Sequence, residues 1–204
     1  SSDLAARMTW EESLVVTEGD PVWRYLAHRT GVRKVYKWVR YHPALPYLSM
    51  EGEVTYHPAM IALVLSANGK EGLTIHRTYL TEEGRKASVE SPKKIMACSS
   101  IQGGAIRLFN HSSTLGVAEG IETSICAAKL FKIPVWSLIS SPMFKSFTPP
   151  EEVKKLIIFS DNDTNFTGQA SAFELANKMS LKGISVEVQV PPKPNSDWAD
   201  YDAV

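Results

Sequence analysis

The chain has 204 residues, 44% of them hydrophobic and 22% charged, and its 22 Lys and Arg residues balance 22 Asp and Glu residues. These values are near the averages of folded globular proteins and exclude disordered or fibrous architectures, and the zero net charge by itself identifies no partner. Only two cysteines occur, Cys98 and Cys126, which excludes a disulfide framework or a zinc ribbon. Without a membrane-length apolar run or a signal-peptide pattern, we expect a cytoplasmic protein with no membrane partner.

The first half of the chain predicts a short helix followed by strands. Residues 20–31 are expected to form the helix, with Asp20 as its N-cap and Gly31 as its stop. Residues 54–108 contain short apolar runs separated by Asn-Gly and Glu-Gly dipeptides, which are typical of strands joined by turns. We therefore expect a small, strand-rich α+β lobe over residues 1–112.

From residue 113 onwards the pattern alternates between strand and helix. Buried strands are predicted at residues 115–118, 134–139, 155–159 and 184–190, and helices at residues 121–131 and from about 168 to 183. This order is typical of a mostly parallel sheet with flanking helices. The fold class is therefore α/β, with this domain over residues 113–204.

Acidic side chains follow two of these strands at the point where each strand ends. Glu119 comes directly after the strand at 115–118, and Asp161 with Asp163 follows the strand at 155–159. Open α/β sheets place functional residues at the carboxyl ends of their strands, so neighbouring strands would bring the three carboxylates together. Clustered carboxylates repel one another unless cations neutralise them, and oxygen ligands suit Mg²⁺ or Mn²⁺.

Gly120 and Gly168 fit the same hypothesis, because a sharp strand-to-helix turn and close approach of a phosphate both need a residue without Cβ. A simpler interpretation is also open, since Asp after a strand often caps a helix.

Residues 115–123 (LGVAEGIET), 156–163 (LIIFSDND) and 168–170 (GQA) carry two motifs in a fixed order. These segments resemble the Toprim domain shared by topoisomerases and bacterial-type primases, most closely the Toprim domains of phage and plasmid primases and primase-helicases. The resemblance covers roughly residues 113–204. It implies a Toprim fold in which Glu119, Asp161 and Asp163 are catalytic and hold the metal.

The resemblance extends into the first half of the chain. The segments 74–80 (TIHRTYL), 86–87 (KA), 91–94 (SPKK) and 104–109 (GAIRLF) are similar to the basic lobe that precedes Toprim in those primases. It implies that nucleotide and template phosphates are bound by Arg77, Lys86, Lys93 and Lys94. A polyanionic substrate held over metal-bound carboxylates needs cationic groups of this kind. Without the resemblance, these residues would be interpreted as solvated turn charges.

The roles of three further acidic residues stay open. The family often has an acidic residue four positions after the glutamate, where this chain has Thr123, and Glu122 could either reach the metal or face solvent. Asp197 and Asp200 either support a second metal, as further acidic residues do in related proteins, or cap a short C-terminal helix.

The resemblance implies the catalytic core of a DNA primase, which makes short RNA primers on single-stranded DNA by metal-dependent nucleotidyl transfer. The expected cofactor is Mg²⁺ or Mn²⁺, and the expected partners are a single-stranded DNA template and nucleoside triphosphates, with a replicative helicase as a further candidate. Two alternatives are a Toprim nuclease that uses water as its nucleophile, and a nucleic-acid-binding replication module without catalysis.

Overall fold

The computed structural model describes residues 2–201, which form two compact units. The first unit comprises the described residues up to 64 together with 72–101, and the second comprises 65–71 together with the described residues from 102 onwards. Residues 102–112, which the sequence assigns to the strand-rich lobe, thus pack with the second unit. No helix among residues 2–201 is long and apolar enough to cross a membrane.

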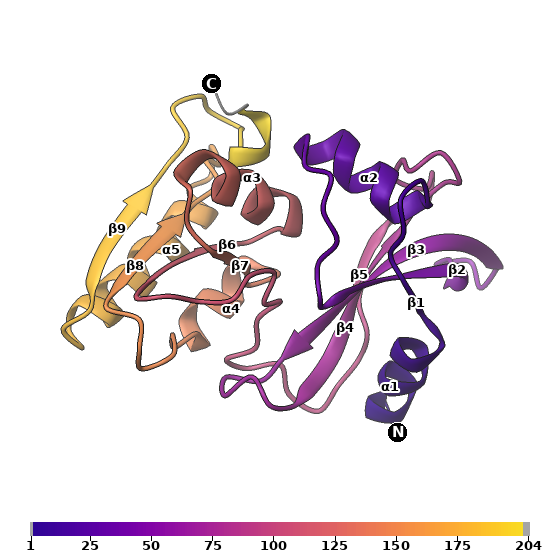
Figure 1. The fold of residues 1–204 in the computed structure, drawn as a ribbon, viewed down its shortest axis with the longest axis horizontal. Helices are drawn as coiled ribbons and strands as arrows, with labels where there is room; N and C mark the ends of the chain where they lie inside the picture. The colour runs from indigo at the N-terminus through magenta and orange to yellow at the C-terminus, as the bar shows by residue number, and fades with distance from the viewer. Residues whose placement is uncertain (1, 202–204) are drawn as a thin grey trace. The chain divides into compact units, whose positions relative to one another are not determined.

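The first unit is built on a five-stranded sheet whose spatial order follows the chain. Its strands are β1 (Leu14–Val15), β2 (Val39–Leu48), β3 (Val54–Leu65), β4 (Gly72–Tyr79) and β5 (Lys93–Ile95). Strand β2 pairs antiparallel with β3, and β4 pairs antiparallel with β5. Helix α1 (Ser2–Glu12) lies against β4 (Figure 1). The predicted strand-rich lobe is confirmed.

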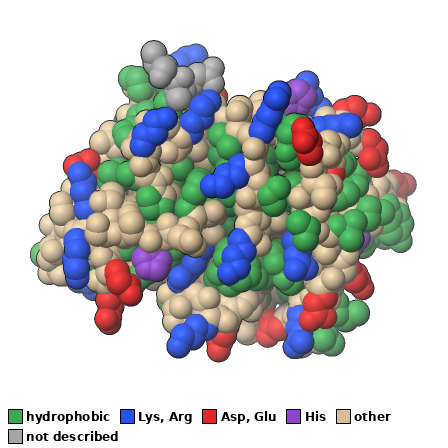
Figure 2. Space-filling view, in the orientation of Figure 1, with side chains coloured by type: hydrophobic (Ala, Val, Ile, Leu, Met, Phe, Trp, Pro, Cys, Tyr) green, Lys and Arg blue, Asp and Glu red, His purple; other side chains and the backbone are tan. Residues whose placement is uncertain are grey.

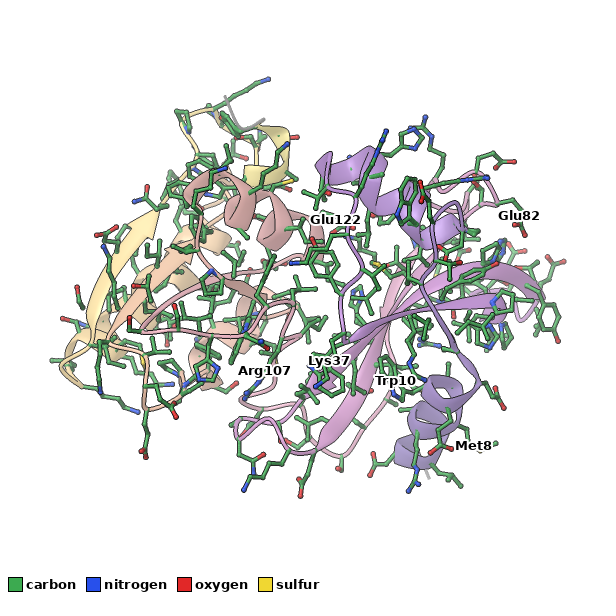
Figure 3. All side chains as sticks on the ribbon, in the orientation of Figure 1. Met8, Trp10, Lys37, Glu82, Arg107 and Glu122 are labelled. Atoms are coloured by element: carbon green, nitrogen blue, oxygen red, sulfur yellow. The ribbon has the colours of Figure 1, made fainter. Side chains whose placement is uncertain are left out.

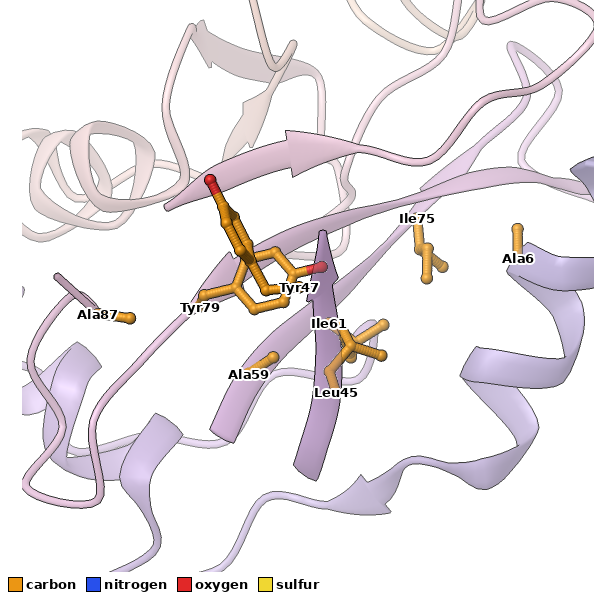
Figure 4. Close-up of a cluster of buried hydrophobic side chains, with 8 residues drawn as sticks. All are labelled: Ala6, Leu45, Tyr47, Ala59, Ile61, Ile75, Tyr79 and Ala87. Carbon is orange, nitrogen blue, oxygen red and sulfur yellow. The ribbon is translucent and has the colours of Figure 1, made fainter. Parts of the chain in front are cut away.

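One face of this sheet carries a compact apolar cluster (Figure 4). At its centre the rings of Tyr47 and Tyr79 meet edge to face, with centroids 5.0 Å apart, and the Tyr79 hydroxyl donates to the carbonyl of Pro46. Each buried tyrosine thus combines a large apolar area with a satisfied polar tip. The other buried members of the cluster are Ala6, Leu45, Ala59, Ile61, Ile75 and Ala87.

The predicted N-terminal helix is present as α2 (Pro21–Thr30). The Asp20 carboxylate accepts a hydrogen bond from the backbone N–H of Trp23, and Gly31 ends the helix in the left-handed conformation with φ of 64°. Both ends follow the capping rules that the sequence suggested.

The second unit is built on a four-stranded parallel sheet in the order β7-β6-β8-β9. Its strands are β6 (Thr114–Ala118), β7 (Val135–Ser137), β8 (Lys155–Phe159) and β9 (Ser185–Gln189), and its helices are α3 (Ile121–Phe131), α4 (Ser141–Ser146), α5 (Thr167–Ser180) and the short 3₁₀ helix η1 (Trp198–Asp200). This arrangement confirms the predicted α/β class of the domain.

The sheet winds in opposite directions from its two central strands. From β6 the chain passes through α3 to β7 at one side, and from β8 it passes through α5 to β9 at the other. Because such crossovers are right-handed, α3 and α5 cover opposite faces of the sheet, as Figure 1 shows. Strands β6 and β8 therefore flank the point where the winding reverses, which is where open α/β sheets bind ligands.

In the first unit, α1, β1 and β2 were not predicted, and in the second unit two local features differ from the sequence prediction. Strand β7 is shorter than the predicted segment 134–139, and the short helix α4 after it was not predicted. The left-handed conformation of Ile139, with φ of 75°, ends the extended chain there. A β-branched residue rarely adopts this conformation, so the turn could not be predicted from the sequence.

Candidate functional site

The site lies at the carboxyl ends of β6 and β8. These strands are hydrogen-bonded neighbours in parallel register, with Ala118 opposite Phe159 at their ends. Glu119 follows the first strand directly, and Asp161 follows the second after a single serine. The parallel register therefore brings the first and second acidic motifs to the same edge of the sheet, as the sequence predicted.

Glu119 is held by the segment that follows β7. Its carbonyl oxygen accepts hydrogen bonds from the Ser137 hydroxyl at 2.7 Å and from the Ile139 N–H at 2.8 Å. Its carboxylate oxygen Oε2 accepts from the Ser141 hydroxyl at 2.6 Å. The strained turn at Ile139 thus places the Ser141 hydroxyl within hydrogen-bonding distance of the Glu119 carboxylate. Sequence reasoning missed Ser141, because serine is common at the start of helices and no motif marked it.

Asp161 lies in surroundings that oppose its ionisation. Burial is the largest cause, and the negative charges of neighbouring carboxylates add to it, so that the pKa of Asp161 rises from 3.8 to about 7. In decreasing order of effect, these neighbours are Glu119, Asp197, Asp163 and Asp200. The charges of four other carboxylates of the second unit therefore act on Asp161.

The Asp161 oxygen Oδ1 is buried and makes no hydrogen bond. A buried carboxylate oxygen without a donor is costly, because it has lost its water without gaining a partner. A cation at this position would supply the interaction that Oδ1 lacks, and it would reduce the repulsion among the carboxylates.

Asp163 is oriented by the first turn of α5. Its Oδ2 accepts a hydrogen bond from the Gly168 N–H at 2.9 Å. A Cβ on Gly168 would lie 3.0 Å from that oxygen and 3.1 Å from the Asp161 carbonyl oxygen, so a side chain there would crowd both aspartates. The buried side chain of Gln169 supports the loop further, donating to the side-chain oxygen of Asn162 and to the Asp163 carbonyl, each at 3.0 Å.

Asp197 and Asp200 form a capping box around η1. The Asp197 carboxylate accepts from the Ala199 N–H, and the Asp200 carboxylate accepts from the Asp197 N–H at 3.1 Å. The capping interpretation is therefore confirmed, while their charges still reach Asp161. Trp198 between them packs edge to face on Phe131 and Phe159, as expected of a packing residue.

Glu122 does not face solvent. It lies in the first turn of α3 (Figure 3), and only 4% of its surface is exposed. Its Oε2 is 3.6 Å from the position that a Cβ on Gly120 would occupy, so the side chain folds back over the start of the helix. The absence of a side chain at Gly120 leaves room for this arrangement.

The groups around Asp161 that could ligate a metal are all carboxylates, and carboxylate oxygens are typical ligands of Mg²⁺ and Mn²⁺. Over residues 2–201, no group of three or more His, Cys, Asp or Glu side chains has the spacing that holds a metal ion. The carboxylates interact electrostatically, and their side chains would have to move to ligate one cation together. The unpartnered Oδ1 of Asp161 fits such a cation.

The predicted phosphate-binding residues lie in the first unit. Arg77 is within β4, paired with Lys94 on β5, and its guanidinium donates to the Tyr79 hydroxyl and to the Ile95 carbonyl at 3.3 Å each. The Lys94 ammonium donates to the Leu48 carbonyl and lies 3.9 Å from the centre of the Tyr47 ring. Lys93 is also on β5, and Lys86 is exposed on the turn before it.

Solved structures of primases share this fold. The catalytic core of DnaG matches with a TM-score of 0.56 at 10% identity, covering 96% of this chain and 67% of that one. The RNA polymerase domain of Mycobacterium tuberculosis primase DnaG matches with a TM-score of 0.54 at 13% identity, covering 98% and 76%. At these identities the likeness shows the fold alone.

The primase fragment of the bacteriophage T7 primase-helicase protein is 17% identical, with a TM-score of 0.49, and the match covers 86% of this chain. This chain spans 63% of the length of that fragment. No curated protein sequence matches the chain.

Together, the doubly wound sheet and the Glu and Asp-x-Asp motifs are those of a Toprim domain, and residues 114–203 match the model described as "Toprim domain". Residues 1–108 match the model described as "Domain of unknown function (DUF7146)", and since this match spans more than half of the chain, the chain belongs to that family.

Proposed function

We propose that this chain is the catalytic core of a DNA primase, which makes short RNA primers on single-stranded DNA by metal-dependent nucleotidyl transfer. The observation that carries the proposal is Asp161, at the reversal point of the sheet, whose buried oxygen Oδ1 has no hydrogen-bond partner and whose pKa is raised by burial and by the charges of four other carboxylates. The proposed partners are the template, nucleoside triphosphates and a replicative helicase.

In this proposal Glu119, Asp161 and Asp163 hold one or two Mg²⁺ or Mn²⁺ ions. When bound, the cation would lower the pKa of the attacking primer hydroxyl and neutralise charge on the leaving pyrophosphate. Asp197 and Asp200 are proposed to support a second ion. Electrostatic stabilisation of this kind can supply most of a rate enhancement, so no Ser or Cys nucleophile is needed.

The chain's own residues would preorganise the site. The Ser141 hydroxyl fixes the Glu119 carboxylate, and the Gly168 N–H fixes Asp163. Gly120 and Gly168 are proposed to let phosphate groups approach the start of their helices. The proposed phosphate ligands from the first unit are Arg77, Lys86, Lys93 and Lys94.

The test is incubation of the chain with single-stranded DNA, Mn²⁺ or Mg²⁺ and labelled ribonucleotides. New short oligomers that disappear in the Asp161→Asn, Asp163→Asn double variant would support the proposal. A shortened template would instead indicate a Toprim nuclease, and neither product would indicate a binding module. Either of those results would contradict primer synthesis by this chain.

A further inference from the structure

One stretch of the first unit carries a strong local charge, although the whole chain is neutral. Residues 21–50 contain no Asp or Glu. The same stretch holds six Lys and Arg residues, which are Arg24, Arg29, Arg33, Lys34, Lys37 and Arg40. Separation of this kind indicates a surface that attracts an anionic partner.

Helix α2 turns these cations outwards. Its buried face is formed by Val22, Tyr25 and Leu26 and packs into the unit. On its other face and on the segment that follows, the basic side chains are exposed. Figure 2 shows Lys and Arg side chains gathered with a histidine over the region of α2, and Figure 3 places Lys37 on the segment between α2 and β2. We call this surface the basic track, made up of Arg24, His28, Arg29, Arg33, Lys34 and Lys37.

A cavity of about 270 Å³ opens on the basic track. Its lining is Trp23, Arg24, Ala27, His28, Gly31 and Arg33, without an acidic side chain. The half-buried Trp23 has the Arg33 guanidinium carbon 5.8 Å from its ring centre. Further along the track, the Lys37 ammonium lies 4.6 Å from the ring centre of Trp38. Aromatic faces therefore alternate with cations along this surface.

The acidic groups facing the track lie next to Arg24. Its guanidinium donates to the Glu82 carbonyl at 3.3 Å, and its charge contributes to lowering the pKa of Glu83. Asp20 faces the start of α2 as its cap. Arg33 and Lys37 are accordingly better probes of the track than Arg24.

We infer that the basic track is a binding site for single-stranded nucleic acid, in which Arg33, Lys34 and Lys37 neutralise successive phosphates and Trp23 stacks on a base. A cationic surface that follows the backbone, interleaved with aromatic rings, is the combination that binds single strands without reading their sequence. A duplex, whose bases are already stacked, cannot use the Trp23 ring in this way. The site uses residues of the first unit alone and needs no metal.

The test is a fluorescence-anisotropy titration of the full chain with labelled single-stranded DNA and RNA at several salt concentrations, in the presence of EDTA. The Arg33→Gln, Lys37→Gln variant should bind on the order of tenfold more weakly, and its plot of log K against log salt should flatten by roughly 1.4, about 0.7 for each lost contact. The matched control is Lys154→Gln with Lys182→Gln, which removes two exposed charges from the second unit and should bind like the wild type.

A second pair of variants tests the stacking role. Trp23→Leu should weaken binding about fivefold or more with the salt slope unchanged, whereas Trp23→Phe should retain most of the affinity, because any aromatic face can stack. A duplex of equal length should bind more weakly than the single strand. Thermal melts of each variant would separate a loss of binding from a loss of folding.

The inference is overturned if the Arg33→Gln, Lys37→Gln variant keeps the affinity and salt slope of the wild type. It is also overturned if the Lys154→Gln, Lys182→Gln control loses as much affinity as that variant. Equal binding of Trp23→Leu and wild type would exclude base stacking and leave an unspecific polyanion surface, which also contradicts the inference. The Asp161→Asn, Asp163→Asn variant should bind normally in EDTA. Failure of primer synthesis is therefore distinguishable from failure of this site.

Discussion

The charge state of Asp161 links the geometry of the site to the stability of the chain. Its pKa in the folded, metal-free chain is raised to about 7, above the 3.8 expected for an unperturbed aspartate. Protonated Asp161 therefore stabilises the fold at low pH, and this contribution is lost as the pH rises through about 7. Above that pH the ionised group is held among like charges.

We expect Asp161→Asn to be more stable than the wild type at about pH 8, with the difference shrinking towards about pH 5, where the wild-type carboxyl is protonated. Urea denaturation in EDTA at a series of pH values measures this. Glu51→Gln, a change at an exposed carboxylate, is the control and should show no such trend. A stability difference that does not vary with pH would contradict the raised pKa.

Arg107 is a second residue whose surroundings define its role. Its guanidinium lies 4.3 Å from the centre of the Trp136 ring and donates to the carbonyls of Ser66 and Ala67, at 3.2 and 2.8 Å. A Cβ on Gly69 would come within 3.0 Å of three atoms of this guanidinium. The side chain therefore fixes the turn at 65–71 within the second unit (Figure 3).

We expect Arg107→Gln to lower the free energy of unfolding by about 2 kcal/mol, because two charge-assisted hydrogen bonds and a cation–π contact are lost. The free energy of unfolding of Arg107→Lys should lie between those of the wild type and Arg107→Gln, because lysine keeps the positive charge but lacks the planar guanidinium. Chemical denaturation compares the three proteins. Equal stability of Arg107→Gln and the wild type would show that the turn is held by other contacts.

At the scale of single elements, helix α5 begins with a strained residue. Phe166 is its N-cap in the left-handed conformation, with φ of 60° and ψ of 16°, and 67% of its surface is exposed. Asparagine adopts this conformation more readily than phenylalanine, so Phe166→Asn should raise the free energy of unfolding by about 0.5 to 1 kcal/mol. Thermal unfolding of the variant and the wild type would measure this difference in stability.

Phe173 provides the matched control. It is also an exposed phenylalanine, at 58%, but it lies inside α5. Phe173→Asn should lower stability slightly, because asparagine is a poorer helix former and gains nothing there. If both variants change stability in the same direction, conformational strain at Phe166 is not the cause.

The strand pair β4 and β5 carries the predicted phosphate ligands in two different settings. Arg77 is hydrogen-bonded within the unit, and its Nε is buried without a hydrogen-bond partner. We expect Arg77→Ala to cost about 1 kcal/mol of stability, whereas Lys93→Ala should change it by no more than about 0.5 kcal/mol. Thermal melts compare these costs.

If both residues also bind phosphate, each alanine variant should weaken nucleotide binding in Mn²⁺. The salt dependence of log K for single-stranded DNA should flatten by roughly 0.7 per lost contact. Unchanged affinity and slope in Lys93→Ala, whose fold should be least disturbed, would remove β5 from the proposed substrate site.

At the scale of the whole molecule, the net charge is zero, while the charges of four other carboxylates of the second unit act on Asp161. A cation that binds the folded chain alone should stabilise it by mass action, by about 2.7 kcal/mol when free Mn²⁺ reaches roughly 100 times its Kd. The melting temperature should therefore rise with Mn²⁺ concentration. Calorimetric titration gives the Kd for comparison.

The Asp161→Asn, Asp163→Asn variant should show neither Mn²⁺ binding nor the rise in melting temperature. A parallel titration with NaCl at equal ionic strength would exclude an effect of ionic strength, and Lys154→Gln, a change at an exposed charge of the second unit, is the control variant. Equal Mn²⁺ stabilisation of variant and wild type would place the ion elsewhere and remove these aspartates from the site.

The sequence by itself determined the alternation of elements in the second unit and the places of its acidic motifs. Strand β8 and helix α3 have the predicted bounds, because a buried parallel strand and an amphipathic helix each leave a local apolar pattern. The positions of Glu119 directly after β6 and of Asp161 after one intervening residue beyond β8 could be predicted in the same way, since they depend only on where each strand ends.

Only the tertiary structure decided how these motifs meet. The adjacency of β6 and β8, the delivery of Ser141 to Glu119 and the burial of Glu122 depend on contacts between segments far apart in the chain or on a strained turn. The same holds for Arg107, whose hydrogen-bond partners are the carbonyls of residues 66 and 67. Local patterns record how one element is buried, whereas pairing order and side-chain partners are set by the packing of all elements at once.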